Sequence, residues 1–163
     1  MKRYIIGLGN PILGDDGVGW RVAEEVEKRI LDRADIQVDC YSLGGLSLME
    51  RLTGATHAIL IDSIFTGTKP IGSVSVFPLD DLADQTSGHT ASTHDTSLRN
   101  ALKVGRSMDI ILPDDDHVLV VAIEAEAVYD FSEKLSQPVE ASVPVAVETV
   151  MKLLDQEVKE KNL

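Results

Sequence analysis

Two patterns of hydrophobic and polar positions alternate along the chain. Short apolar runs rich in β-branched residues are typical of strands, and longer segments with apolar residues at every third or fourth position are typical of amphipathic helices. Their alternation predicts an α/β fold built on a mostly parallel sheet. We expect strands at residues 3–8, 36–41, 57–62, 73–77 and 118–124. We expect helices at residues 17–31, 46–52 and 97–108 and from about residue 143 onward.

The same patterns predict how some of these elements are packed. The strand at 57–62 is a continuous apolar run, which indicates a strand covered on both faces. The strand at 73–77 alternates and is therefore expected at an edge of the sheet. Residues 78–95 are polar and aperiodic, which predicts a long loop of a kind that is often functional. In the first helix, four apolar residues fall on one face opposite a charged face: Val18, Val22, Val26 and Ile30.

Composition limits the class of protein. With 163 residues and 44% hydrophobic content, residues 1–163 are expected to form a single domain with a substantial core. No apolar run approaches the roughly 20 residues of a membrane span, and the run near the N-terminus is too short for a signal peptide. We therefore expect a cytoplasmic protein without membrane contact. A net charge of −12 argues against nucleic acid as a partner, whereas it permits a basic protein partner or a cation.

The single cysteine narrows the chemistry further. Cys40 excludes an internal disulfide and any metal site built from several thiolates within the chain. A nucleophilic role is open to a lone thiol. Because Cys40 stands at the end of a strand pattern, we expect a small buried hydrophobic residue instead.

A glycine-rich loop between the first strand and the first helix carries two adjacent carboxylates. Residues 7–19 contain five glycines, and Asp15 and Asp16 stand at the entrance to the helix. Glycine at this density indicates tight turns or a close approach of the backbone to something else. A dinucleotide-binding loop is disfavoured because Ile12 occupies its third glycine position, and the sequence has no phosphate-loop Gly-Lys-Ser/Thr. The aspartates are either helix caps or ligands, and a single cap leaves the second carboxylate free.

Topology sorts the candidate residues, because ligands of an open parallel sheet bind beyond the carboxyl ends of its strands. Asp15 and Asp16 follow the first strand, and Asp62 ends the third. His89 and His94 lie in the long loop that returns to a helix on the same side. Two other histidines begin strands and therefore belong to the opposite edge: His57 and His117.

Two carboxylates and one imidazole at one edge support two kinds of chemistry. Such a set suits a divalent transition metal with open coordination positions, and it also suits general acid–base hydrolysis without a metal. Asp62 is the most informative member, because a charge at the end of an apolar strand is destabilising unless it is paired or bound. The non-functional interpretation of His94 is a solvated loop residue or a histidine at the entrance to a helix. The residues alone leave these interpretations open.

Residues 7–19, Gly-Leu-Gly-Asn-Pro-Ile-Leu-Gly-Asp-Asp-Gly-Val-Gly, closely resemble the N-terminal signature of the nickel–iron hydrogenase maturation proteases. The resemblance implies a three-layer αβα fold of phosphorylase/hydrolase-like type, with a twisted, mostly parallel sheet of five strands. It also implies an aspartyl-type endopeptidase that removes the C-terminal extension of the hydrogenase large-subunit precursor after nickel insertion. The resemblance spans nearly the whole chain, through Asp62 and residues 93–98, 124–126, 130–132 and 143–144.

Carried over by position, the family's catalytic and metal-binding residues fall on Asp16, Asp62 and His94. The resemblance implies no permanent cofactor, because nickel already bound in the precursor recruits the enzyme, and we expect a monomer. Asp16 stands where some members carry Glu, which keeps the carboxylate and shortens its reach. Residues 42–46 depart from the Gly-Thr-x-Gly-Leu loop that the family is expected to have. This departure bears on which substrate is bound more than on whether the protein is active. Four further residues are near enough to matter: Asn10, Asp15, Asp39 and Asp95.

Two alternative functions stay open at this point. Peptidyl-tRNA hydrolase also begins with a strand and a Gly-Leu-Gly-Asn-Pro loop. That similarity covers only the first eleven residues, and a net charge of −12 is poorly suited to binding tRNA. The other alternative is a non-catalytic assembly factor that binds a metal or a partner protein.

Overall fold

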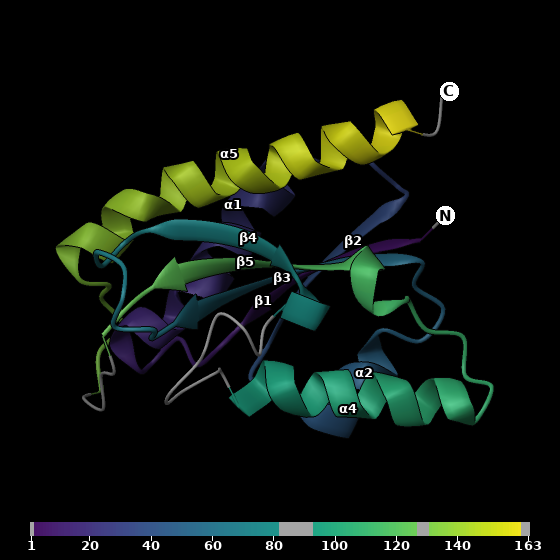
Figure 1. Cartoon of the computed structure of the whole chain (residues 1–163). Helices are drawn as coiled ribbons and strands as arrows, with labels where there is room; N and C mark the ends of the chain where they lie inside the picture. Colours follow the sequence, from purple (N-terminus) through teal and green to yellow (C-terminus); the bar gives the residue numbers. More distant parts are fainter. Residues whose placement is uncertain (1, 82–92, 127–130, 161–163) are drawn as a thin grey trace.

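The computed structural model describes residues 2–81, 93–126 and 131–160, with the side chains at 93–97 and 157–160 outside that description. The described strands are β1 (Arg3–Leu8), β2 (Ile36–Tyr41), β3 (His57–Ile64), β4 (Val74–Pro78) and β5 (Val118–Glu124). They form a twisted sheet in the order β2-β1-β3-β5-β4 (Figure 1). β1, β2, β3 and β5 are parallel, and β4 pairs antiparallel with β5 at one edge, as its alternating pattern predicted.

Helices cover both faces of this sheet and make the three layers visible in Figure 1. One face carries α1 (Val18–Arg29) and α5 (Gln137–Glu160), and the other carries α2 (Gly45–Arg51) and α4 (Thr93–Ser107). The predicted α/β class, with three layers and a mostly parallel sheet, is confirmed. Within the described ranges, no helix is long and apolar enough to cross a membrane. Short 3-10 turns occur at η1 (Gly14–Gly17), η2 (Leu79–Asp81) and η3 (Asp115–His117).

Each face of the sheet has its own core, because successive residues of a strand point to opposite sides. On β1, Ile6 and Leu8 pack with α2 and α4, whereas Ile5 packs with α1 and α5. Burial of one such side chain contributes about 1.5–3 kcal/mol, so both cores contribute substantially to stability. The apolar face predicted for α1 is confirmed, since all four of its residues are buried: Val18, Val22, Val26 and Ile30.

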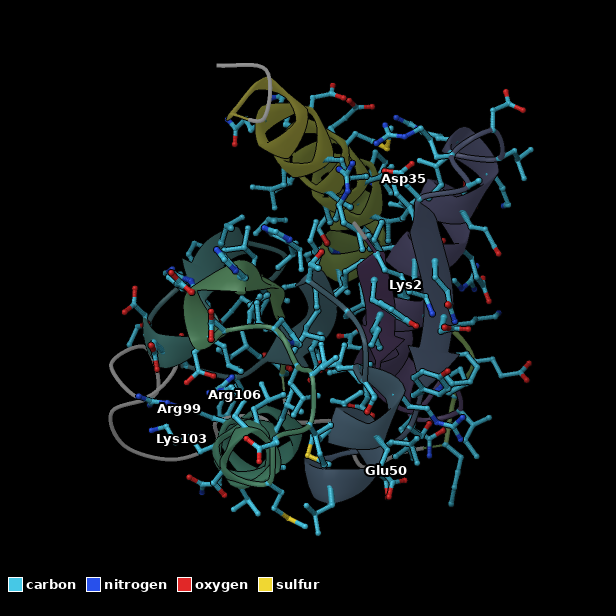
Figure 2. The ribbon with its side chains drawn as sticks, turned by 90° about the vertical axis from the view of Figure 1, so that its right-hand side faces the viewer. Lys2, Asp35, Glu50, Arg99, Lys103 and Arg106 are labelled. Atoms are coloured by element: carbon cyan, nitrogen blue, oxygen red, sulfur yellow. The ribbon has the colours of Figure 1, made fainter. Side chains whose placement is uncertain are left out.

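The amino ends of the parallel strands form the side of the molecule that faces the viewer in Figure 2. Lys2 precedes β1 and Asp35 precedes β2 on this side. The rings of His57 and His117 stack here, with their centroids 4.5 Å apart. Both histidines thus lie at the edge opposite the carboxyl ends of the strands, as predicted.

The main departures from the predicted elements lie at helix starts. α5 begins at Gln137, earlier than predicted. The helix can include Pro138 because this residue stands in the first turn, where a missing N–H costs little. The helix then continues through Pro144. α4 begins at Thr93, inside the stretch predicted to be a loop. The prediction missed this start because the first turn is polar and has no apolar repeat. Residues 82–92 of that predicted loop lie outside the described residues.

Candidate active site

The loop after β1 folds back so that Asp16 packs against Gly9. Gly9 has a φ of +115°, a conformation that L side chains rarely adopt. A Cβ atom at this position would also lie less than 3.0 Å from the backbone carbonyl oxygen of Asp16. Glycine is therefore required at position 9 for this loop conformation.

The first turn of α1 rests directly on the ends of β1 and β3. A Cβ atom at Gly19 would lie less than 3.0 Å from the carbonyl oxygens of Leu8 and Ile61. The small residue permits this close approach and brings η1 into contact with β3. The glycines at 9 and 19 thus have steric roles that determine where Asp16 lies.

Ser63 joins two carboxylates at the carboxyl edge of the sheet. Asp62 is only 2% exposed, and its Oδ1 accepts the backbone N–H of Ser63 at 2.8 Å. Asp16 is partly exposed, and its Oδ1 accepts the Ser63 hydroxyl at 3.4 Å. Its other oxygen accepts the backbone N–H of Asn10 at 2.7 Å. A buried carboxylate and a more accessible one therefore belong to one hydrogen-bonded group.

This group has the chemistry of a cation or water site. A carboxylate as buried as Asp62 is costly to keep ionised unless hydrogen bonds or a cation compensate its charge. The neighbouring carboxylate of Asp16 adds to the negative potential, which favours a bound cation. β3 continues to Ile64, two residues beyond the strand end predicted at Asp62, so Ser63 belongs to the same strand. Ser63 was not among the residues predicted for the site, although its place directly after Asp62 was a usable signal.

Asp15 does not cap α1, which corrects one interpretation of the adjacent aspartates. The N-cap position of α1 is Gly17, and the Asp15 carboxylate turns away to Ser136. Ser136 donates its backbone N–H at 2.6 Å and its hydroxyl at 2.7 Å. Asp15 therefore interacts with the start of α5, a helix distant in sequence, and the adjacent aspartates have different partners.

The predicted imidazole lies at the limit of what the structure describes. His94 belongs to the first turn of α4, but its side chain is outside the described residues, as is that of Asp95. His89 lies outside the described residues altogether. The structure thus brings Asp16 and Asp62 together through Ser63, and the role of His94 stays a prediction.

The end of β2 supports the same loop from the other side. The Ser42 hydroxyl donates to the carbonyl oxygen of Gly9 at 2.6 Å. The Gly9 N–H donates to the carbonyl of Tyr41 at 3.2 Å, and the Trp20 indole N–H reaches that carbonyl at 3.4 Å. Ser42 begins the segment that departs from the expected family loop, and here it helps to hold the loop that carries Asp16.

Glu124, at the end of β5, organises the loop that follows β3. It is 1% exposed. Its carboxylate accepts the Thr66 N–H at 2.8 Å, the Thr66 hydroxyl at 2.9 Å and the Gly67 N–H at 3.0 Å. These bonds compensate the burial of its charge. Glu124 thus fixes the backbone shortly beyond Ser63, a role that the sequence analysis did not assign.

Cys40 has the properties of a packing residue. It is half-buried, and its Sγ lies 3.9 Å from the carbonyl oxygen of Trp20 on α1. Burial, together with the nearby carboxylates of Glu24, Glu27 and Asp39, raises the pKa of the thiol to about 11. Since the thiolate is the nucleophile, the neutral thiol is unreactive near pH 7.

The three-layer fold is shared with solved hydrogenase maturation endopeptidases. HybD of E. coli gives a TM-score of 0.79 at 20% identity, with 96% of this chain and 94% of that chain covered. HybD of Thermococcus kodakarensis gives a TM-score of 0.68 at 25% identity, with 94% of this chain and 99% of that chain covered. These similarities establish the class of fold.

Comparison of sequences leads to the family. HupD of Rhizobium leguminosarum bv. viciae, a hydrogenase expression/formation protein, is 23% identical over 153 residues, which are 94% of this chain and 74% of that protein. The hydrogenase maturation protease family model matches residues 4–153. The chain belongs to the hydrogenase maturation protease family and is a peptidase that processes a hydrogenase precursor. This long match favours the protease over peptidyl-tRNA hydrolase and over a non-catalytic assembly factor.

Proposed function

We propose that this peptidase removes the C-terminal extension of a nickel–iron hydrogenase large-subunit precursor after nickel has been inserted. The observation that carries the proposal is the group formed by Asp16, Ser63 and buried Asp62. It lies at the edge of the sheet where ligands of parallel α/β folds bind. The family membership supplies the reaction type, and the carboxylates supply the means of recognising a metal-loaded substrate.

Nickel enters this proposal as part of the substrate. Carboxylate oxygens and an imidazole nitrogen are suitable ligands for a divalent transition metal with open positions. Asp16 and Asp62 supply the oxygens, and His94, from the first turn of α4, supplies the nitrogen. Nickel in the precursor compensates the negative charge of the carboxylates, so a precursor without nickel binds poorly. Cleavage then acts as a checkpoint on metal insertion, and the enzyme needs no permanent cofactor.

The same side chains serve the hydrolysis itself. Peptide cleavage adds water across the C–N bond: a base takes a proton from the attacking water, and the leaving amine receives one. A carboxylate that is accessible and held in place by hydrogen bonds, such as Asp16, can orient and deprotonate this water. The Ser63 hydroxyl and the Asn10 N–H hold the Asp16 carboxylate in place, which reduces the cost of positioning during the reaction.

The test is cleavage of a purified, nickel-loaded precursor by variants of the three proposed residues. Asp16→Ala, Asp62→Ala and His94→Ala are each expected to lower kcat/KM by about 10²–10⁴-fold, the range for loss of a positioned acid or base. Wild-type rates in all three variants would contradict the site assignment.

The amino edge of the sheet offers a matched control with the same donor types. Asp114, Asp116 and His117 are exposed, and their ligand atoms lie within 4.8 Å of one another. They stand at the opposite ends of the strands from Asp62. Asp116→Ala and His117→Ala are expected to leave kcat/KM unchanged, which shows that the effect belongs to the carboxyl edge.

A further inference from the structure

Asp15 is a buried carboxylate that the proposed chemistry does not use. It is 3% exposed, and both of its oxygens are engaged: Oδ1 with the N–H of Ser136 and Oδ2 with the Ser136 hydroxyl. Ser136 stands directly before α5, and its carbonyl accepts the N–H of Glu140 in the first turn of that helix. One carboxylate thus fastens the loop after β1 to the beginning of α5.

Backbone hydrogen bonds extend this contact along both segments. The Gly14 N–H donates to the carbonyl of Ser132 at 2.7 Å, and the Ser132 N–H donates to the carbonyl of Ile12 at 2.9 Å. Leu13 and Ser132 form a parallel β-bridge. Residues 12–15 and 132–136 therefore lie side by side, and the Asp15–Ser136 pair closes one end of this arrangement, next to Asp16.

The adjacent aspartates point to different partners because of the turn in which they lie. Residues 14–17 form a 3-10 turn, in which successive side chains are about 120° apart around the axis. Asp15 consequently faces α5 while Asp16 faces Asn10 and Ser63. Hydrogen bonds to a charged group are stronger than those between neutral groups. Because Asp15 and Asp16 are adjacent, the two bonds of Asp15 to Ser136 restrain the backbone that carries Asp16.

We propose that Asp15 is a positioning residue of the peptidase reaction, which acts together with Ser136 by holding Asp16 where the substrate meets it. The inference rests on the proposed function for the role of Asp16. It assigns no contact between Asp15 and substrate, since both oxygens of Asp15 are bonded to Ser136.

Kinetics of three variants on the nickel-loaded precursor test this role. Asp15→Ala removes both acceptor atoms and is expected to lower kcat/KM at least about tenfold, since small misplacements of reacting groups are costly. Asp15→Asn keeps a carbonyl oxygen for the Ser136 N–H and an amide that can donate to the hydroxyl, so most of the activity is expected to return. Ser136 is exposed, and Ser136→Ala keeps the backbone N–H bond to Asp15 while it removes the hydroxyl bond, so a smaller loss is expected.

A matched control separates positioning from stability. Asp115 is also buried, at 8% exposure, and its carboxylate accepts a bond from Arg106 at 2.7 Å on the amino-edge side of the molecule, where Figure 2 labels Arg106. Asp115→Ala is expected to lower the melting temperature while kcat/KM, measured where every variant is folded, stays at the wild-type value. An equal loss of kcat/KM in Asp115→Ala and Asp15→Ala would mean that Asp15 has a structural role alone.

A double-mutant cycle with Asp16 provides the decisive result. If Asp15 acts through Asp16, Asp15→Ala causes no further loss of kcat/KM, or of affinity for the nickel-loaded precursor, in an Asp16→Ala background. Losses that multiply would overturn the proposal, as would an Asp15→Asn variant as impaired as Asp15→Ala. Failure of the wild type to cleave the precursor would instead refute the proposed function. Wild-type cleavage with undiminished Asp15→Ala and Ser136→Ala would refute this inference alone.

Discussion

Ser63 has a central place among the residues of the site because its backbone and its side chain contact different carboxylates. Its N–H bond to Asp62 is short, at 2.8 Å, whereas its hydroxyl lies 3.4 Å from Asp16. Ser63→Ala removes only the longer bond, so we expect kcat/KM to fall about two- to fivefold, as for loss of a weak hydrogen bond. Steady-state kinetics on the precursor measure this effect. A loss as large as that of Asp62→Ala would give the hydroxyl a direct chemical role instead.

Gly9 is the residue whose replacement should most directly disturb the loop that carries Asp16. Gly9→Ala combines an unfavourable φ with a clash against the Asp16 carbonyl. Gly54 is a suitable control, because its φ is +80° but a Cβ atom there would have nothing within 4 Å. We expect Gly54→Ala to lower the free energy of unfolding by about 1 kcal/mol and Gly9→Ala by about 2–3 kcal/mol more. Urea denaturation of both variants tests the difference, and equal losses would contradict the clash.

Cys40 yields a prediction about pH. Because the pKa of its thiol is raised to about 11, the thiol stays neutral at pH 7 and ionises only as the pH approaches that value. Alkylation by iodoacetamide in the folded protein should therefore be slow at pH 7.5 and accelerate up to about pH 11. Cys40→Ala should retain precursor cleavage. Fast alkylation at neutral pH, together with loss of cleavage in this variant, would revive the nucleophile interpretation.

At the scale of elements, α5 tests how proline position affects a helix. Pro138 lies in the first turn, whereas Pro144 lies inside the helix and cannot donate to the carbonyl of Glu140. Pro144→Ala restores that donor, and we expect it to raise the free energy of unfolding by about 1–2 kcal/mol after the gain in unfolded-chain entropy is subtracted. Pro138→Ala should give no gain. Denaturation curves of the Pro144→Ala and Pro138→Ala variants measure the two free energies of unfolding. A gain in Pro138→Ala and none in Pro144→Ala would contradict this explanation.

The elements differ in how well the sequence predicts them. β1, β2 and β5 have the predicted bounds because buried strands leave clear apolar runs. The starts of α4 and α5 were missed because they depend on polar first turns and tolerated prolines, which lack a hydrophobic period. The Asp15–Ser136 contact joins segments 121 residues apart, and no local pattern signals such a pairing. Topology correctly placed Asp16 and Asp62 at one edge, but the bonds that fix them depend on tertiary structure.

For the molecule as a whole, the net charge of −12 raises the question of whether it binds nickel by itself. In the proposed mechanism the precursor supplies nickel, and the peptidase contributes only part of a coordination shell. Calorimetric titration of the isolated protein with Ni²⁺ should therefore show weak binding that Asp16→Ala and Asp62→Ala reduce. Tight, stoichiometric binding without the precursor would instead indicate a resident metal site.

In the proposed function, Asp16, Asp62 and His94 recognise nickel that is already inserted in the precursor. The most direct test of this recognition is the single-turnover cleavage rate of one precursor preparation, divided into nickel-loaded and nickel-free halves. We expect rapid cleavage of the loaded half and little or none of the nickel-free half. Equal cleavage of both halves by the wild-type enzyme would contradict the proposed recognition of nickel.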